Sequence, residues 1–405
     1  MKKLLLLILF SIFALTSCIG PEYGDLRKYR RQCNNNDEAA CAKYLFIESW
    51  IDVRDESFTT NLEQQDWNYW RERYLDKLQT KEDAYVAIDT MLSSLDDPYT
   101  RFLTPEELEE QNFTISAQLS GIGVVISSKD GKISVEDVME ASPADKNGLK
   151  IGDIILKIDG NSTSGYDIKK VANMIRGKKG TTVELLILRD KGMFSKKIVR
   201  DTIKIKAVKY KMLDDGIAYI KLSTFMSQSA GAEFTEALNQ ASKAKALVID
   251  LRGNTGGLLQ NATYIANLLL KEGNIVSVHK KGNKTETIKV EHIGSDINMP
   301  IVVLTNGYSA SAGEILAAAL QENGRAKLVG EKTFGKGLIQ RIMPLPLNTA
   351  VNVTIAKYLT PQGHDIHKNG IKPDWEVKYS IEDAKKNKDT QLDKAIEVVK
   401  AIKTN

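Results

Sequence analysis

The sequence predicts a mixed α/β chain made of an α/β (α+β) core, an inserted small β-barrel-like domain and an N-terminal helical segment. Apolar residues recur at helical spacing up to about residue 113, short β-rich runs occupy residues 114–205, and strands alternate with helices over residues 206–380. A chain of 405 residues is also too long for one ordinary core. We therefore expect several folded parts rather than one.

The bulk composition is that of a soluble globular protein. Hydrophobic residues make up 42% of the chain and charged residues 27%, which is enough apolar material for packed cores. The net charge of +4 is small for 405 residues, so the electrostatic signature of a nucleic-acid-binding protein is missing. We therefore expect no nucleic-acid partner.

The chain begins with an export signal. Residues 1–17 combine a short basic start with an apolar run too brief to span a bilayer comfortably, which is typical of a signal peptide. The run ends at Cys18 in a segment that resembles the bacterial lipobox, where this cysteine is acylated and anchors the mature protein. A chance cysteine after an ordinary signal peptide is the alternative. We expect an exported protein on a bacterial membrane, facing the periplasm by default.

The next segment is polar and rich in asparagine. Residues 18–42 favour a tether between the anchor and the folded body. Cys33 and Cys41 lie in or next to a polar stretch of an exported chain, where a disulfide is permitted but not required. The sequence leaves that pairing open.

Residues 43–113 are expected to form helices that lead into the core. Thr80 begins a capping-box-like sequence, and Thr104 followed by Pro105 marks another helix start. Two apolar stripes at helical spacing indicate core-facing sides: Trp67, Trp70, Tyr74 and Leu78, then Tyr85, Ile88, Leu92 and Leu95.

The inserted domain and the core differ in their sequence patterns of strands and helices. Within 114–205 the expected strands are 122–127, 133–138, 154–158 and 183–188, with one helix near 167–174. The core has two continuous apolar strands, 246–251 and 301–304, each followed by a helix, which indicates a sheet buried on both faces. Residues 381–405 carry one apolar helical stripe and predict a C-terminal helix.

Two strand-to-helix corners in the core carry candidate chemistry, because helix N-termini present unpaired N–H groups there. One is the glycine-rich turn from Asp250 to Gly257, which on its own favours a plain tight turn. The other contains Ser311, whose hydroxyl would lie at a helix N-terminus with the Ala312 N–H directed at a developing oxyanion. Taken alone, this corner is better explained by simple N-capping by serine.

A third loop, 330–340, nearly matches a phosphate-binding P-loop. That motif needs Ser or Thr after its lysine and a helix to follow, but Gly337 follows Lys336 and the next run reads as strand. Nucleotide binding is therefore not expected.

The serine and lysine together make the family recognisable. The chain resembles the carboxyl-terminal processing peptidases, or tail-specific proteases, which are Ser-Lys serine peptidases with an inserted PDZ domain. The resemblance runs from about residue 80 to the C-terminus. It rests on ordered motifs at 95–102, 250–257, 306–314, 333–337 and 359–374, together with the inserted domain.

The resemblance implies a role for each matching residue. Ser311 is implied to be the nucleophile, Lys336 the general base, and Gln340 the residue that orients the lysine. Ser309 is then structural. The implied oxyanion donors are the N–H groups of Ala312 and of one of Gly256 and Gly257, with Gly257 preferred. Glu314 matches an acid of uncertain role, and Tyr308 and Gly313 depart from the family, many members of which carry Gly and Ser there.

The chemistry of lysine agrees with this assignment. A free lysine has a pKa near 10.4 and can accept a proton at neutral pH only if burial lowers that pKa. Phe334, Leu338 and Ile339 are apolar neighbours of Lys336 that we expect to provide the burial. None of the histidines suggests a competing triad, and no metal motif is present, so we expect neither metal nor cofactor. The histidines are His279, His292, His364 and His367.

The inserted domain resembles a bacterial PDZ domain. Its motifs are Gly121-Ile122-Gly123-Val124, then 141–144, 148–149, 152–155 and 158–160. The first of these would offer N–H groups to the terminal carboxylate of a peptide. A PDZ fold that only packs against the core is the alternative.

The sequence thus predicts a serine endopeptidase that cleaves envelope proteins near their C-termini. Its expected partners are proteins or peptides with free C-termini and the membrane. A noncatalytic PDZ lipoprotein that binds C-terminal tails, as an adaptor or chaperone, is the alternative. The substrate and the oligomeric state, a homodimer included, are left open.

Overall fold

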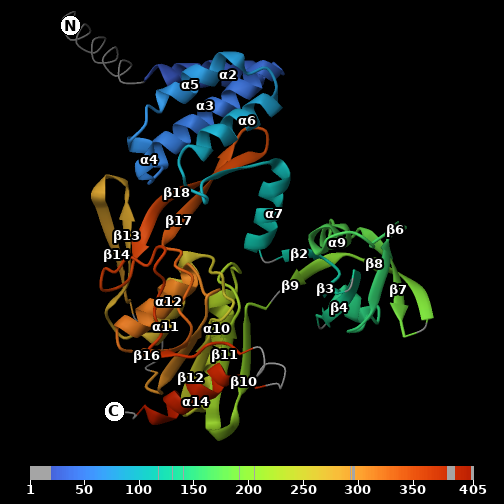
Figure 1. The fold of residues 1–405 in the computed structure, drawn as a ribbon, viewed down its shortest axis with the longest axis vertical. Coiled ribbons are helices and arrows are strands. Elements are labelled where there is room, and N and C mark those ends of the chain that lie inside the picture. Colours follow the sequence, from blue (N-terminus) through green and yellow to red (C-terminus); the bar gives the residue numbers. More distant parts are fainter. Residues whose placement is uncertain are drawn as a thin grey trace, which may run out of the picture.

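The computed structural model describes residues 20–402, apart from 117, 130, 140, 191, 205, 292, 294–296 and 381–387. The predicted signal peptide and Cys18 lie outside the described residues. Figure 1 shows three parts: a helical bundle at the N-terminal end, a central core of sheets and helices, and a small β-rich domain set to one side. The predicted fold class is therefore confirmed.

The N-terminal part is a helical bundle that begins earlier than expected. In place of a tether, α2 (Pro21–Cys33) packs on α3 (Glu38–Glu56), and its Tyr29 side chain is buried in the bundle core. A disulfide joins Cys33 to Cys41 across the turn between the two helices. The polar composition hid this helix because Tyr29 lies among four basic residues.

The remaining helices of the bundle follow the sequence signals closely. Thr80 and Asp83 form a capping box at the start of α6 (Lys81–Ser93), and the Thr104 hydroxyl accepts the Glu107 N–H at the start of α7 (Pro105–Ser116). The stripe predicted from Trp67 is shorter than expected, since α4 (Thr60–Glu63) and α5 (Asn68–Tyr74) are separate and a 3-10 turn η1 (Leu75–Lys77) follows.

In its described residues, the inserted domain is a six-stranded antiparallel sheet with two helices. Its strands are β3 (Val124–Lys129), β4 (Lys132–Val138), β5 (Ile154–Ile158), β7 (Thr182–Arg189) and β8 (Gly192–Val199), with β6 (Asn161–Ser162) beside β5. The predicted helix is α9 (Ile168–Ile175), and a one-turn helix α8 (Pro143–Lys146) was not foreseen. The chain enters through β2 (Gln118–Gly121) and leaves through β9 (Asp201–Lys204), which pair with each other.

The core sheet is mostly parallel, as its continuous apolar strands predicted. Its order is β10 (Val208–Met212), β11 (Ile217–Leu222), β12 (Ala246–Asp250), β15 (Ile301–Thr305), β16 (Ala326–Gly330) and β19 (Trp375–Glu376). Only β10 runs antiparallel to its neighbour.

Helices cover both faces of this sheet. Leu247 and Ile249 of β12 face α10 (Ala230–Gln240), α11 (Leu259–Leu269) and α12 (Ala312–Glu322). Val248, between them, faces α14 (Thr390–Ala401), which explains the C-terminal apolar stripe. The carboxyl ends of β12, β15 and β16 therefore lie at one edge of a rigid layer.

A second sheet connects this core to the helical bundle. It contains β1 (Arg101–Leu103), β18 (Thr349–Leu359), β13 (Asn274–Lys280) and β14 (Lys284–Lys289), with β17 (Leu338–Leu345) along the other side of β18. Val351 and Val353 of β18 belong to the same buried cluster as the bundle helices. None of the described helices combines the length and the apolar character needed to cross a bilayer.

Candidate active site

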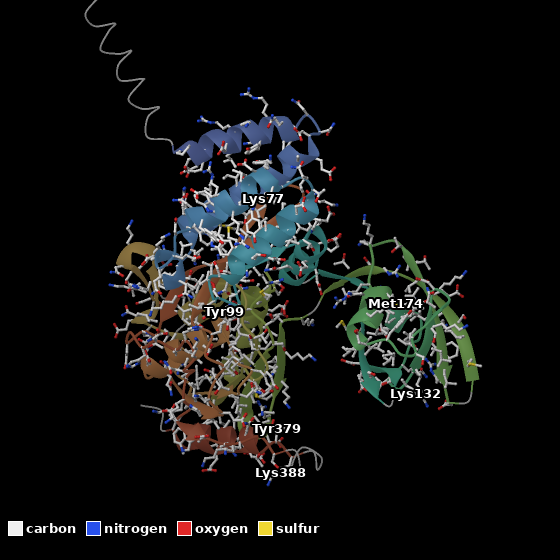
Figure 2. All side chains as sticks on the ribbon, turned by 45° about the horizontal axis from the view of Figure 1, so that its top comes forward. Lys77, Tyr99, Lys132, Met174, Tyr379 and Lys388 are labelled. Atoms are coloured by element: carbon white, nitrogen blue, oxygen red, sulfur yellow. A yellow bond between two sulfur atoms is a disulfide. The ribbon has the colours of Figure 1, made fainter. Side chains whose placement is uncertain are left out.

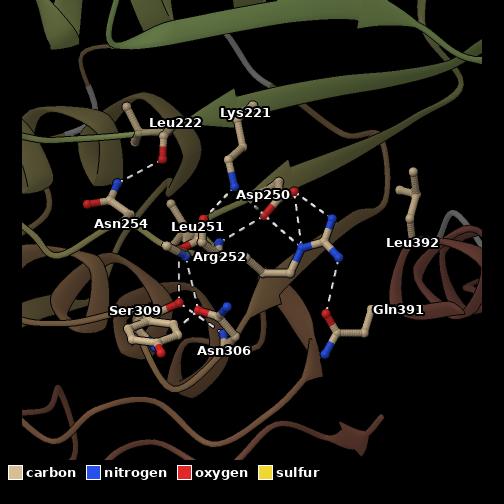
Figure 3. Close-up of polar contacts among 12 residues, drawn as sticks. Lys221, Leu222, Asp250, Leu251, Arg252, Asn254, Asn306, Ser309, Gln391 and Leu392 are labelled. Carbon is tan, nitrogen blue, oxygen red and sulfur yellow. Dashed lines mark hydrogen bonds and ion pairs between the residues drawn. The ribbon is translucent and has the colours of Figure 1, made fainter. Parts of the chain in front are cut away.

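The glycine-rich turn after β12 is fixed by side-chain hydrogen bonds to neighbouring strands. The buried Asn254 donates from Nδ2 to the Leu222 carbonyl at 2.8 Å and accepts the Gly256 N–H at 2.9 Å. The Ser309 hydroxyl donates to the Leu251 carbonyl at 2.8 Å, so the two corners predicted from the sequence meet (Figure 3).

A charged network holds the start of the same turn. The Arg252 guanidinium contacts the Asp250 carboxylate at 2.7 Å and the Asp389 carboxylate before α14 at 2.8 Å. Burial alone would raise the pKa of Asp250, but hydrogen bonds and charge from Arg252 and Lys221 hold that pKa below its usual range. Figure 3 shows Arg252 between Asp250 and Gln391 of α14. The turn is thus tied to the C-terminal helix.

Ser311 occupies the corner between β15 and α12. Its backbone has φ 54° and ψ −118°, in the left-handed half of conformational space that costs a non-glycine residue of order 1–3 kcal/mol. Such a sharp turn is typical of serines displayed at a strand-to-helix junction. Ser309, in contrast, is fully buried and uses its hydroxyl within the turn.

Glu314, a buried carboxylate, holds the serine and lysine segments together. Its Oε2 atom accepts the backbone N–H of Ser311 at 2.9 Å and that of Lys336 at 2.8 Å. Its Oε1 atom accepts the Thr333 hydroxyl at 2.5 Å and the Gly335 N–H at 2.7 Å. Sequence patterns alone assigned this acid no clear role, and in the structure it holds the serine and lysine segments together.

Tyr358 of β18 makes a second link between the same segments. Its hydroxyl group contacts the Ser311 carbonyl at 3.0 Å and also the Lys336 carbonyl. Burial raises the pKa of this phenol well above its ordinary value, so it stays a proton donor. No local pattern marks Tyr358 in the sequence, because its partners lie on two distant loops.

Lys336 sits in a partly apolar environment. Its ammonium lies 4.9 Å from the centre of the Tyr99 ring, which Figure 2 places near the junction of bundle and core. Burial lowers the pKa of Lys336 from its ordinary value, and the Asp97 carboxylate acts in the opposite direction. Phe334 does not provide the expected cover because its ring is mostly exposed. Tyr99, from the 95–102 motif, takes that place.

Among the described contacts, the predicted catalytic side chains do not bond one another. Gln340 donates to the Thr354 hydroxyl at 3.4 Å. Among the described residues, no hydrogen bond joins Gln340 to the Lys336 ammonium, or that ammonium to the Ser311 hydroxyl. The backbone of the site is thus assembled, while the side chains of the proposed proton relay are not in direct contact.

Two backbone N–H groups beside Ser311 are unpaired within the described part of the chain: those of Gly257 and Ala312. The Gly256 N–H is different, because it donates to Asn254. Gly256 has φ 99°, and a Cβ atom there would lie 2.8 Å from the Ser311 Cβ atom. Glycine is therefore needed for this close approach, and Gly257 rather than Gly256 has a free donor.

The four residues predicted for peptide binding line one cavity of the inserted domain. This cavity of about 90 Å³ lies between β3 and α9, with mainly aliphatic walls. Its lining includes Gly121, Ile122, Gly123 and Val124. Within the described residues, the N–H groups of Ile122 and Gly123 donate no hydrogen bond. The cavity therefore combines an apolar floor with available donors.

Within the described part of the chain, no histidine forms a hydrogen bond to Ser311, Lys336 or Gln340. His364 pairs with Glu322 at 2.9 Å, and His279 bonds Thr285 on the outer hairpin. His367 lies near Tyr99, with 6.5 Å between the ring centres. His292 is outside the described residues.

Comparison with known proteins identifies the core and the inserted domain. The model of peptidase family S41 matches residues 216–377, and the PDZ domain model matches residues 134–189. A carboxyl-terminal-processing protease from Picosynechococcus sp. is 41% identical, over 82% of each chain. The carboxy-terminal processing protease CtpA of Bacillus subtilis is 40% identical, over 75% of this chain and 66% of that protein.

Solved structures agree with these sequence relatives. A photosystem II D1 C-terminal processing protease is 30% identical, with a TM-score of 0.59 over 83% of this chain and 93% of that one. The chain therefore belongs to the carboxyl-terminal processing peptidases of family S41, which makes it a serine-type protease with a PDZ domain.

Proposed function

We propose that this protease is an endopeptidase that cleaves proteins near their C-termini with Ser311 as nucleophile and Lys336 as general base. One observation carries the proposal: the two backbones share one oxygen of Glu314, beside the unpaired N–H groups of Gly257 and Ala312. The names of its relatives support cleavage near C-termini.

The reaction would proceed by acyl transfer. Neutral Lys336 takes the Ser311 hydroxyl proton while the serine oxygen attacks the peptide carbonyl, and the resulting oxyanion accepts the Gly257 and Ala312 N–H groups. Lys336 then gives its proton to the leaving amine. A water molecule, deprotonated by the same lysine, hydrolyses the acyl-enzyme and restores Ser311.

The Lys336 ammonium must move toward the Ser311 hydroxyl before this step. The lysine ammonium rests over Tyr99 and does not bond Ser311 among the described contacts, and catalytic hydrogen bonds in free enzymes often form only when substrate is bound. Gln340 is the residue that would orient the moved lysine. It lies on β17, which begins at Leu338 soon after Lys336.

The PDZ domain supplies the choice of substrate in this proposal. A tail would lie in the cavity with its terminal carboxylate on the Ile122 and Gly123 N–H groups and an aliphatic side chain against the apolar floor. With the anchor at Cys18, the enzyme would act on envelope proteins from the membrane, facing the periplasm.

The test compares single variants on a peptide with a free C-terminus. Ser311→Ala and Lys336→Ala are expected to lose cleavage by at least about a thousandfold, whereas Lys332→Ala, an exposed lysine on the same loop, keeps it. Circular dichroism and thermal unfolding check that each variant folds. Full activity in Ser311→Ala would reject Ser311 as the nucleophile, whereas absence of cleavage by the unaltered protein would leave the tail-binding adaptor as the better proposal.

A matched substrate pair tests the PDZ role. Amidation of the peptide C-terminus removes the carboxylate that the Ile122 and Gly123 N–H groups would bind, so cleavage is expected to slow. Equal cleavage rates for the free acid and the amide would contradict carboxylate recognition and favour a PDZ domain that only packs against the core.

A further inference from the structure

The three most exposed aromatic side chains of the described residues lie on loops at the end of the core sheet that also carries Ser311. Tyr308 is 71% exposed, Tyr379 59% and Phe334 56%, whereas the next, Tyr69 of the distant helix α5, is 47% exposed. Large apolar side chains that stay in water in one region of a surface indicate a binding site. We call Tyr308, Phe334 and Tyr379 the aromatic rim.

The aromatic rim lies along one edge of the core sheet. Tyr308 follows β15, Phe334 follows β16 and Tyr379 follows β19, and these three strands are parallel neighbours. The Phe334 N–H donates to the Ser309 carbonyl at 3.0 Å, and the Tyr379 N–H donates to the Glu331 carboxylate at 3.2 Å. Hydrogen bonds therefore hold the three loops side by side.

This edge is continuous with the catalytic residues. Tyr308 precedes Ser311 by three positions and Phe334 precedes Lys336 by two, and Glu314 holds both segments. Ligands of α/β proteins bind at the carboxyl ends of the parallel strands. A polypeptide whose scissile carbonyl reaches Ser311 would therefore pass close to the loops that carry Tyr308 and Phe334.

We propose that the aromatic rim binds large apolar side chains of the substrate next to the scissile bond. The inference rests on the proposed function and adds a substrate class to it: unfolded tails that carry leucine-like or aromatic residues close to the cleavage point. Ring faces bind such side chains in preference to polar ones. Folded proteins bury these residues, so the rim would add a second requirement for an unfolded segment, separate from the terminal carboxylate.

A binding experiment tests the rim without catalysis. The mature chain with Ser311→Ala is titrated with short fluorescent peptides whose C-termini are amidated, which removes the carboxylate that the PDZ cavity would take. Two peptides differ only by Leu or Ser at the central positions. We expect the Leu peptide to bind about tenfold more tightly than the Ser peptide. Tyr308→Ser or Phe334→Ser should weaken the affinity for the Leu peptide about fivefold and leave the affinity for the Ser peptide unchanged.

A matched control and a cleavage assay complete the test. Tyr69→Ser removes an exposed aromatic ring far from the site and should not change the affinity for either peptide. In the active enzyme, Tyr308→Ser should raise KM for the Leu peptide and leave kcat unchanged.

Three outcomes separate the proposals. Equal losses of affinity for both peptides would overturn the rim as a site for apolar side chains. A change of oligomeric state on light scattering would assign the rim to contact with another copy of the chain. Side-chain-dependent binding by an enzyme that cleaves nothing would instead reject the proposed function and leave the rim as a peptide-binding surface.

Discussion

The backbone N–H groups of Ser311 and Lys336 donate to the same oxygen, Oε2 of Glu314, at 2.9 and 2.8 Å. The two residues lie on different loops, so this single atom fixes their spacing. An interior carboxylate that accepts four donors is costly to weaken, because each donor left unpaired in a buried site loses about 1–3 kcal/mol. The site therefore depends on a residue that performs no chemistry itself.

The first prediction concerns this carboxylate. Glu314→Gln keeps the shape but replaces one acceptor oxygen by an amide, which should lower the free energy of unfolding by about 1–3 kcal/mol and strongly reduce kcat. Urea denaturation and peptide cleavage measure the two effects. Glu236→Gln, on the exposed side of α10, is the control and should change neither. A Glu314→Gln enzyme of normal kcat would show that the shared oxygen is dispensable.

The second prediction concerns pH. Burial lowers the pKa of Lys336 and the Asp97 carboxylate opposes this, so kcat/KM should rise with pH through the folded pKa of the lysine. Asp97→Asn removes the opposing charge, lowers that pKa further and shifts the rise to lower pH. The matched control is Asp96→Asn, since Asp96 does not contribute to the lysine pKa. A shift to higher pH would contradict this electrostatic role.

The same lysine links stability to pH. Because its folded pKa is below its unfolded one, the unfolded chain binds more protons in the interval between them, and stability rises with pH there. Replacing Lys336 by Met should remove this part of the slope. Unfolding in urea at a series of alkaline pH values measures it, and an unchanged slope in Lys336→Met would argue against a buried cation.

The third prediction separates the two serines. Ser309 is fully buried and its hydroxyl donates to the Leu251 carbonyl and accepts the Asn306 N–H. Ser309→Ala should therefore reduce the free energy of unfolding by about 1–3 kcal/mol, with any loss of rate following from the loosened turn. Ser311→Ala should instead abolish cleavage with little change in stability. The reverse pattern would exchange the roles of the two serines.

The fourth prediction concerns the C-terminal helix. Arg252→Ala leaves the buried Asp250 with Lys221 as its remaining cationic partner, and removing one member of a buried ion pair costs about 3–5 kcal/mol. Hydrogen exchange should quicken in α14 as well, since Arg252 also holds Asp389. Lys327→Ala, which removes a more exposed ion pair with Asp374, is the control. Unchanged exchange in α14 would show that its apolar face alone keeps it docked.

The fifth prediction concerns the disulfide. Cys33 and Cys41 close a short loop, and chain-entropy estimates give such a crosslink about 2–3 kcal/mol. The double serine variant should lose stability in the N-terminal bundle while its kcat stays the same, because the bond lies in the bundle rather than at the site. Limited proteolysis between α2 and α3 reports the loosening. A fall in kcat without unfolding would indicate an unexpected coupling between bundle and site.

The sequence predicted those parts of the site that local patterns encode. Ser311 follows a buried strand and opens an alanine-rich helix, so its place at a corner could be inferred from neighbouring residues alone. The roles of Glu314 and Tyr358 could not, since their partners come from loops that only the fold brings together. Phe334 was expected to cover Lys336, but periodicity does not fix side-chain direction in a loop. The exposed Phe334 ring instead belongs to the proposed aromatic rim.

The pairing of β2 with β9 has a consequence for how this molecule can change. Gln118 faces Lys204 in that pair, so the polypeptide leaves and re-enters the remainder of the protein at adjacent backbone positions. To the rest of the chain, the whole intervening domain is topologically a long hairpin loop, and lengthening such a loop costs little once its ends are held together. The inserted domain can therefore diverge, or be exchanged by recombination at this point, without redesign of the protease core.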